Sequence, residues 1–305
     1  MSLAYASQIL GRKFGVYNKP AKSGYTWTDA DGYAWYQNVV TNGGTITKAN
    51  QAKFDTAFQS LKSTNAQDGN SLWSHINQGY WFIGQQSLTN GLFVPFYNTN
   101  TGSGLQPINT SVATNNNFSS YTKTGGLVGD GSSTYIDTGI NNNNTSVWAP
   151  ATSPYRHGYV YLNGTGAQNF PINPFGMSST SQRTFSLQAS SFSNSLLITG
   201  RVYVDSASGG TIFTTTNAGY DGGWGIPNIN GRSTCRIAMG TNQYWTVAAG
   251  IPLNSSLVSG NILIGQAAGS FSQANIIAST FGSALTSTDF ASIDGIVNTL
   301  VAALT

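Results

Sequence analysis

The chain has 305 residues and no Glu; its ten acidic residues are all Asp, set against 13 Lys and Arg, for a formal charge of +3. Charged residues make up 8% of the chain, whereas an average globular domain has about 25%. With aromatic residues at 12%, this composition excludes an intrinsically disordered chain, a nucleic-acid binder that neutralises phosphates and a long coiled coil. No run of about 18 apolar residues is present, so we expect no membrane insertion.

Cysteine use and the N-terminus suggest where such a chain folds. Cys235 is the single cysteine, so no disulfide framework can form within the chain. Residues 1–16 lack the layout of a signal peptide, because Arg12 and Lys13 interrupt their mildly apolar part. We expect a protein that folds in a cytoplasm and is used outside it.

The pattern divides the chain into an arm over residues 1–26, a small helical module over 27–97 and a strand-rich region over 98–305. The arm is basic and carries aromatic side chains that could dock on a neighbouring subunit; a solvated tail is the alternative interpretation. The residues assigned to this assembly arm are Arg12, Lys13, Tyr17, Lys19 and Lys22.

The helical module contains three short amphipathic segments. Thr28 or Asp29 can cap a first helix that the run Asn42-Gly43-Gly44 ends. A second helix is expected after Thr47, with apolar residues on one face: Ala49, Phe54, Ala57, Phe58 and Leu61. The third segment is Ser71–Ile76. Such helices must bury their apolar stripes against something larger.

Beyond residue 98, short runs rich in Val, Ile, Thr, Tyr and Phe alternate with turns rich in Gly, Asn, Pro and Ser. Many short strands separated by turn signals are typical of an antiparallel sandwich or barrel. The clearest runs are residues 157–162, 196–198, 201–204, 211–213, 235–239, 244–247 and 262–265. From Thr286 onward the pattern is again that of an amphipathic helix.

Several motifs, in this order, resemble a group of phage structural proteins. They are Gly43–Thr47 between two helices, Leu72-Trp73-Ser74-x-Ile76, Leu127–Gly139 at the opening of the strand-rich region, and the closing segment Gly282–Phe290. The resemblance covers about residues 27–305. It implies a tail, fibre or decoration protein of the virion.

The same resemblance implies a fold that is mainly β. This fold is a jelly-roll antiparallel β-sandwich of the concanavalin A-like or laminin G-like type, preceded by the helical module and closed by the C-terminal amphipathic helix. Lectins, glycanases and purely structural modules all use this fold, so the resemblance does not fix a ligand.

The sequence offers few groups for hydrolysis. Glycanases on concanavalin-like sandwiches use a pair of Glu, and here only Asp pairs such as Asp130 and Asp137 remain; seven residues apart, they would face opposite sides of one straight strand. A Ser–His–Asp or Cys–His site would have to be built around His75 or His157, and Cys235 is interpreted as a core residue. We therefore predict no catalytic residue and a protein that is not an enzyme.

Metal sites need clusters of His, Cys or carboxylate side chains, and two separated histidines do not supply one. The run Asp29-Ala30-Asp31-Gly32 is similar to the start of a calcium loop, but no Glu is available to close such a site. We interpret it as a helix N-cap and expect neither metal nor cofactor.

Sugar binding is more plausible, because an aromatic face with nearby Asn, Asp and backbone groups suits a glycan. The loop 217–226 combines these groups on a Gly-rich stretch, and its candidate ligand-binding residues are Asn217, Tyr220, Asp221 and Trp224. Residues 242–245 are a weaker candidate. In both segments the alternative is that the Trp packs in the core.

We therefore predict a phage virion protein that is made in the host cytoplasm and displayed on the extracellular particle. Its expected role is tail- or fibre-associated host attachment through weak, multivalent glycan contacts. The alternative is a capsid or tail decoration protein that acts only through subunit interfaces, and a glycanase or lyase ranks third. Expected partners are other virion proteins, copies of the chain itself and a host surface polysaccharide, with no nucleic acid.

Overall fold

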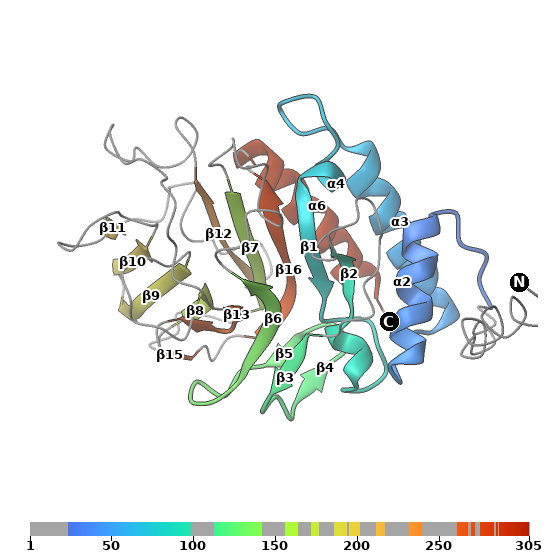
Figure 1. Cartoon of the computed structure of the whole chain (residues 1–305), viewed down its shortest axis with the longest axis horizontal. Helices are drawn as coiled ribbons and strands as arrows, with labels where there is room; N and C mark the ends of the chain where they lie inside the picture. Colours follow the sequence, from blue (N-terminus) through green and yellow to red (C-terminus); the bar gives the residue numbers. More distant parts are fainter. Residues whose placement is uncertain are drawn as a thin grey trace, which may run out of the picture.

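The computed structural model of the chain describes residues 24–98, 113–141, 156–163, 172–176, 186–193, 195–201, 212–216, 232–239, 261–267, 270–271, 275–283, 285 and 287–304. These residues form antiparallel sheets accompanied by a layer of helices (Figure 1). The prediction of a mainly β chain with helices at both ends of its described part is confirmed at this level.

The helices begin where the sequence places capping residues. The Asp29 carboxylate accepts the Gly32 N–H at 2.8 Å, and the Thr47 hydroxyl accepts the Asn50 N–H at 3.2 Å. The helical elements are α2 (Ala30–Thr41), α3 (Lys48–Ser63), α4 (Leu72–His75), the 3-10 helix η1 (Asn90–Phe93) and α6 (Ser287–Ala303). Within the described part of the chain, none of them is both long enough and apolar enough to cross a bilayer.

The first sheet has seven strands, and its main path runs β12-β7-β16-β1-β2, with β5 also paired to β16 and β4 to β5. All of its pairs are antiparallel. Its strands are β1 (Ile76–Trp81), β2 (Pro95–Asn98), β4 (Tyr121–Thr122), β5 (Gly126–Val128), β7 (Arg156–Asn163), β12 (Arg232–Met239) and β16 (Asn275–Ser283). The boundary predicted between residues 97 and 98 falls within β2.

The second sheet also has seven strands, in the order β11-β10-β9-β8-β13-β6-β3. They are β3 (Thr114–Asn116), β6 (Tyr135–Asn141), β8 (Ile172–Gly176), β9 (Ser186–Ser193), β10 (Ser195–Arg201), β11 (Ile212–Thr216) and β13 (Asn261–Ile264). A two-stranded ribbon joins β14 (Gln266–Ala267) to β15 (Ser270–Phe271). The predicted runs 157–162, 196–198 and 235–239 are strands, as are residues 262–264 of the predicted run 262–265, and the run 244–247 lies outside the described residues.

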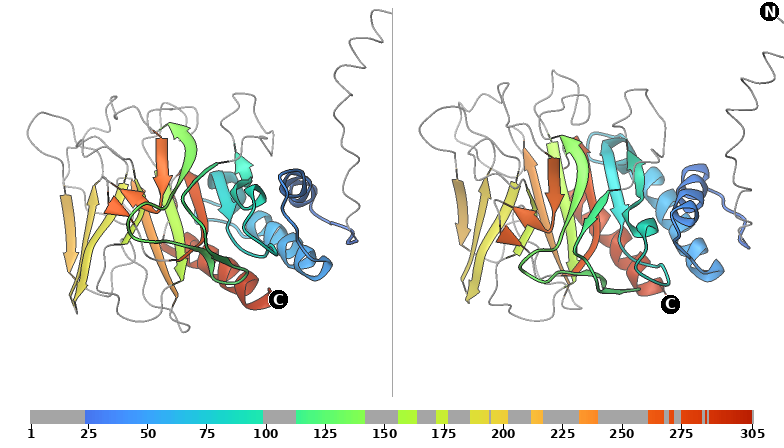
Figure 2. Two further views of the ribbon diagram at one scale, coloured as in Figure 1. Left: turned by 90° about the horizontal axis from the view of Figure 1, so that it is seen from below. Right: turned by 60° about the horizontal axis from the view of Figure 1, so that its bottom comes forward.

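The helices and the second sheet lie on opposite sides of the first sheet (Figures 1 and 2). Alternation along β1 explains this arrangement, because successive side chains of a strand point to opposite faces. Trp81 belongs to the core shared with the helices. Gln78 donates from Nε2 to the Thr138 carbonyl of β6 at 3.2 Å, which links the first sheet to the second.

A single apolar core joins α2, α3 and α6 to the first sheet. Aromatic rings dominate its centre: Trp35, Phe54, Phe58, Trp81 and Phe96 are all at most 2% exposed. The predicted apolar face of α3 accounts for Phe54, Ala57, Phe58 and Leu61 in this core, whereas Ala49 is exposed. The helical stripes are therefore buried against a sheet that includes strands from both halves of the chain.

Candidate functional site

The residues predicted to bind a glycan lie outside the described part of the chain. Asn217, Tyr220, Asp221 and Trp224 follow β11 in the sequence and precede β12. The arm residues Arg12, Lys13, Tyr17, Lys19 and Lys22 also lie outside it. Both assignments stay predictions.

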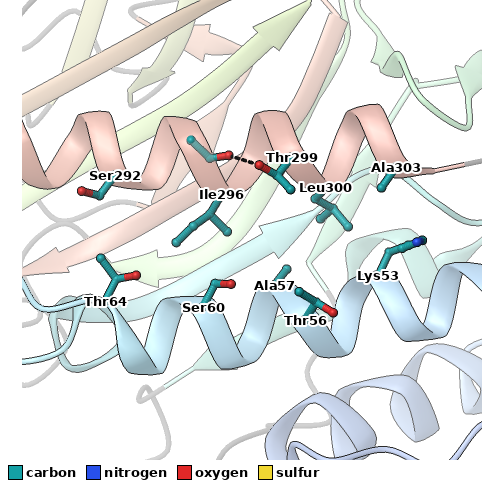
Figure 3. Close-up of a pocket in the computed structure, with 11 residues that line it drawn as sticks. Lys53, Thr56, Ala57, Ser60, Thr64, Ser292, Ile296, Thr299, Leu300 and Ala303 are labelled. Carbon is teal, nitrogen blue, oxygen red and sulfur yellow. Dashed lines mark hydrogen bonds between the residues drawn. The ribbon is translucent and has the colours of Figure 1, made fainter.

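The described residues contain a groove between α3 and α6 (Figure 3). Both helices lie on the side of the first sheet that faces away from the second sheet (Figure 2). The volume of the groove is about 540 Å³. It is lined by residues of both helices (Figure 3): Lys53, Thr56, Ala57, Ser60 and Thr64 from α3 and its end, and Ser292, Gly295, Ile296, Thr299, Leu300 and Ala303 from α6. The groove exists because most of these side chains are small.

Three hydroxyl groups of the groove are satisfied within their own helices. Thr56 donates its hydroxyl to the Ala52 carbonyl at 3.0 Å, Ser292 to the Thr288 carbonyl at 3.0 Å and Thr299 to the Gly295 carbonyl at 2.8 Å. Such back-bonding reduces the need of these three hydroxyls for polar partners from outside.

Apolar surface completes the groove. Leu300 is buried and Ile296 is half-buried, and a Cβ added at Gly295 would meet nothing within 4 Å. Lys53 is the one charged residue among those that line it. A groove of this kind suits an apolar or small-residue helix better than a charged ligand, because docked helices pack side chains of one into grooves of the other.

Both histidines of the chain contact Ser283, the last residue of β16. His75 Nδ1 lies 3.0 Å from the Ser283 hydroxyl, and His157 Nδ1 lies 2.6 Å from the Ser283 carbonyl oxygen. In the sequence these two histidines are far apart, because 81 residues lie between them. Only the pairing of β16 with both β1 and β7 brings them together.

The aspartates considered for hydrolysis hold local structure. The Asp130 carboxylate accepts the backbone N–H groups of Ser132, Ser133 and Thr134 at 2.8 to 3.0 Å. Asp137 accepts the Gly139 N–H at 2.9 Å. Partial burial acts to raise the pKa of Asp130, but these hydrogen bonds, with those from the Ser133 hydroxyl, lower it far below its ordinary value.

Every aspartate in the described part of the chain has such a partner. Asp29 caps α2, as predicted, and Asp31 pairs with Lys62. The other described aspartates with side-chain partners are Asp55, Asp68, Asp289 and Asp294. Among the described residues, no group of three His, Cys or Asp side chains is close enough to hold a metal ion.

Comparison with family models gives no match, and no curated protein matches the sequence. Among solved structures, a Trypanosoma rangeli sialidase mutant with trans-sialidase activity aligns with a TM-score of 0.45 and 9% identity over 82% of this chain. A T. rangeli sialidase aligns with a TM-score of 0.41 and 10% identity over the same share. Tailspike protein 2 of the Escherichia coli O157:H7 bacteriophage CAB120 aligns with a TM-score of 0.39 and 14% identity over 64% of this chain.

The chain spans 39% of the length of these sialidases and 28% of the tailspike. At such identities and TM-scores the alignments transfer neither a residue role nor a substrate to this chain. They do contradict one prediction: the expectation that the chain is not an enzyme is wrong against neighbours that are sialidases and a trans-sialidase. That expectation rested on the missing Glu pair and on the few groups that the sequence offers for nucleophilic catalysis.

Proposed function

We propose that the chain is a structural protein of a bacteriophage particle that is held in its assembly through the helical layer. The observation that carries the proposal is the open groove between α3 and α6, on the far side of the first sheet from the second sheet. This arrangement lets one side of the molecule contact a neighbour while the other side is displayed. The resemblance of the motifs in residues 27–305 to phage structural proteins supports the same role.

The proposed occupant of the groove is the N-terminal arm of a neighbouring copy. The described chain begins at Gly24, close to the start of α3, because a Cβ on Gly24 would lie 3.7 Å from Lys48 Cδ. The preceding 23 residues would span about 35 Å as a helix, at roughly 1.5 Å per residue, which is longer than α3. Leu3, Leu10, Phe14 and Tyr17 recur at spacings of seven, four and three, which would place large side chains on one helical face.

We further propose that the two antiparallel sheets form the concanavalin A-like jelly roll that the resemblance implies. Displayed on a tail or fibre, this region would contact host polysaccharide through Asn217, Tyr220, Asp221 and Trp224. Repeated copies would make weak contacts sufficient. A decoration protein that acts through the helical layer alone is the alternative.

Filling the groove tests the assembly proposal. Gly295→Leu adds a side chain into the groove and also raises helix propensity, so the variant should fold while docking is lost. Ala291→Leu is the matched control, since Ala291 is an exposed residue of α6 that does not line the groove. Light scattering should show the same oligomer for the control and the wild type, and a smaller species for Gly295→Leu.

Deleting residues 1–23 should have the same effect as Gly295→Leu. If the deletion leaves the oligomer intact while Gly295→Leu dissociates it, another segment occupies the groove. An unchanged oligomer in both variants would overturn the assembly proposal.

Attachment is tested separately. Antibody labelling of intact particles should place the protein on the tail or fibre, and a uniform shell lattice would favour the decoration role. Binding of the protein to host polysaccharide should fall with Trp224→Ala and not with Trp73→Phe, which keeps an aromatic ring in the helical layer.

A further inference from the structure

A line of three polar side chains lies where α4, β1 and β16 meet. Asp68 Oδ1 is 3.2 Å from His75 Nε2, and His75 Nδ1 is 3.0 Å from the Ser283 hydroxyl. Asp68 belongs to the turn between α3 and α4, His75 ends α4, and Ser283 ends β16. A nucleophile, a base and a carboxylate that orients the base are the parts of a serine acyl-transfer site.

The Asp68 carboxylate determines which nitrogen of the His75 imidazole carries the proton and which one can accept a proton. Partial burial acts to raise the pKa of Asp68, but hydrogen bonds from the Asn70 side chain and backbone and the nearby His75 outweigh it, so the pKa lies below its ordinary value. Asp68 is therefore an acceptor that keeps a proton on His75 Nε2. The remaining nitrogen, Nδ1, can then accept the Ser283 hydroxyl proton.

The second histidine holds the backbone of Ser283. Complete burial lowers the pKa of His157 to about 3, so its ring is neutral near pH 7. Its Nδ1–H donates to the Ser283 carbonyl at 2.6 Å, and its Nε2 accepts the Thr280 hydroxyl at 3.0 Å. On the other side, Gly282 packs so closely that an added Cβ would lie 1.9 Å from the His75 carbonyl oxygen.

The N-terminus of α6 lies beside the same turn. In the first turn of this 17-residue helix, the Asp289 carboxylate accepts the Gln67 N–H at 2.9 Å, one residue before Asp68. A helix N-terminus carries partial positive charge. This end therefore brings a partial positive charge, together with the Asp289 carboxylate, to the turn that holds Asp68.

We propose that Ser283 is a nucleophile for acyl transfer, with His75 as its general base and Asp68 as the positioning residue. The Ser283 side is half-buried, whereas Asp68 is 48% exposed and His75 12% exposed. The site is thus open to solvent on the Asp68 side, and an ester with a small acyl group such as acetyl is the simplest substrate with which to test it. No residue of the α3–α6 groove takes part.

The reaction balances with water as the second substrate. Ser283 Oγ forms a bond to the ester carbonyl carbon while His75 Nδ1 takes its proton; the tetrahedral intermediate then expels the alkoxide, which receives that proton. The acyl-serine is hydrolysed by a water molecule that gives its proton to His75. Carboxylic acid leaves and the Ser283 hydroxyl is restored.

The test uses the full-length protein with a fluorophosphonate probe and 4-nitrophenyl acetate. The probe should label Ser283, identified by peptide mass spectrometry, and the acetate ester should leave an acetyl group on the same residue. Ser283→Ala should abolish both, whereas Ser119→Ala, at an exposed serine remote in sequence, should change neither.

Asp68→Asn is a second test that does not depend on Ser283→Ala folding correctly. Asp68 is the most exposed of the three residues, so this variant should fold. It should slow labelling by up to roughly 10⁴-fold with an unchanged melting temperature, and a purely structural turn would not slow labelling at all. Absence of label on Ser283 in the wild-type protein, or unchanged labelling in Asp68→Asn, would overturn the proposal. Gly295→Leu should label normally, so failure here and failure of the assembly proposal are distinguishable.

Discussion

Helix α3 has a different neighbour on each side, and the two contacts are built from different chemistry. Toward α2 and the segment before it, Asp55 accepts the Thr28 and Asp29 N–H groups at 2.9 and 2.8 Å. Lys62 pairs with Asp29 at 2.8 Å and lies 4.9 Å from the centre of the Trp73 ring. Toward α6 the facing residues are small, and space remains between the helices.

The difference shows which contact is complete within one chain. On the α2 side, Phe58 fits so tightly that a Cβ on Gly32 would come within 2.9 Å of its ring. On the α6 side, three hydroxyls donate to carbonyls of their own helices, and a Cβ added at Gly295 would face open space. One side is a closed core, and the other has the room that a docked segment requires.

A matched pair of truncations tests this difference most directly. Phe58→Ala removes a fully buried ring whose centroid lies 5.7 Å from that of the Trp35 ring and 5.8 Å from that of the Phe96 ring. This substitution should lower the free energy of unfolding by about 3–5 kcal/mol. Ile296→Ala, at the half-buried groove position, should cost about 1 kcal/mol. Urea unfolding measures both, and equal losses would mean that the groove is as closed as the α2 side.

Asp55→Asn probes the polar part of the closed side. The amide that replaces Oδ2 would face the Tyr25 hydroxyl and the Thr28 N–H, which both bond to that oxygen at 2.9 Å. Losing these bonds in a buried site should cost about 1–3 kcal/mol. Asn38→Asp, on the half-buried face of α2, serves as a control for a charge change elsewhere.

The pH dependence of Asp55 has a definite sign. Burial acts to raise its pKa, but the backbone hydrogen bonds from Thr28 and Asp29 and the Tyr25 hydroxyl lower it below the ordinary value. A lowered pKa means stabilisation that is present above about pH 4 and lost as pH falls through the folded-state pKa. Acid titration of unfolding should therefore be shallower in Asp55→Asn than in the wild type; identical slopes would contradict the assignment.

Gly295→Ala should have the smallest effect, and of opposite sign. The added methyl meets no atom within 4 Å and lies inside α6, so reduced backbone entropy should stabilise the protein by about 0.5–1 kcal/mol. A lower melting temperature would contradict the open space that the structure shows beside Gly295.

Local signals predicted the helices well. Asp29 and Thr47 act as caps at the positions that the sequence indicates, because a side-chain oxygen next to a helical run has only nearby N–H groups to satisfy. The short segment after Ser71 is helical for four residues only, since Ile76 pairs with Gly282 in the sheet. The local helix propensity of this segment carries no information about a pairing partner about 200 residues away in the sequence.

The same limit applies to the sites. His75 and His157 meet at Ser283 through strand pairing, and the α3–α6 groove depends on how two distant helices approach. A sequence pattern indicates which face of a helix is apolar, but not the distance at which it meets another helix. The spacing of small residues in α6, from Ser292 to Gly295 and Thr299, was the available signal for the groove.

The contacts of the described aspartates explain why the chain uses Asp and no Glu. Asp130 reaches three successive N–H groups of its own turn, and Asp29 reaches the first turn of α2. These bonds need a carboxylate close to the backbone, which the shorter side chain of Asp provides. The acidic groups in the described part of the chain are used mainly to hold turns, caps and helix contacts.

The central place of β16 sets the order in which the molecule can be completed during synthesis. β1 and β7 both pair with β16, so neither has this partner until β16 is synthesised. β1 leaves the ribosome about 200 residues before β16. At roughly 5–20 residues per second this delay lasts about 10–40 s. During that time the apolar face of β1 and the rings of α2 and α3 have no finished sheet to cover them, so the nascent chain is most open to aggregation and to chaperones just before its last strand emerges.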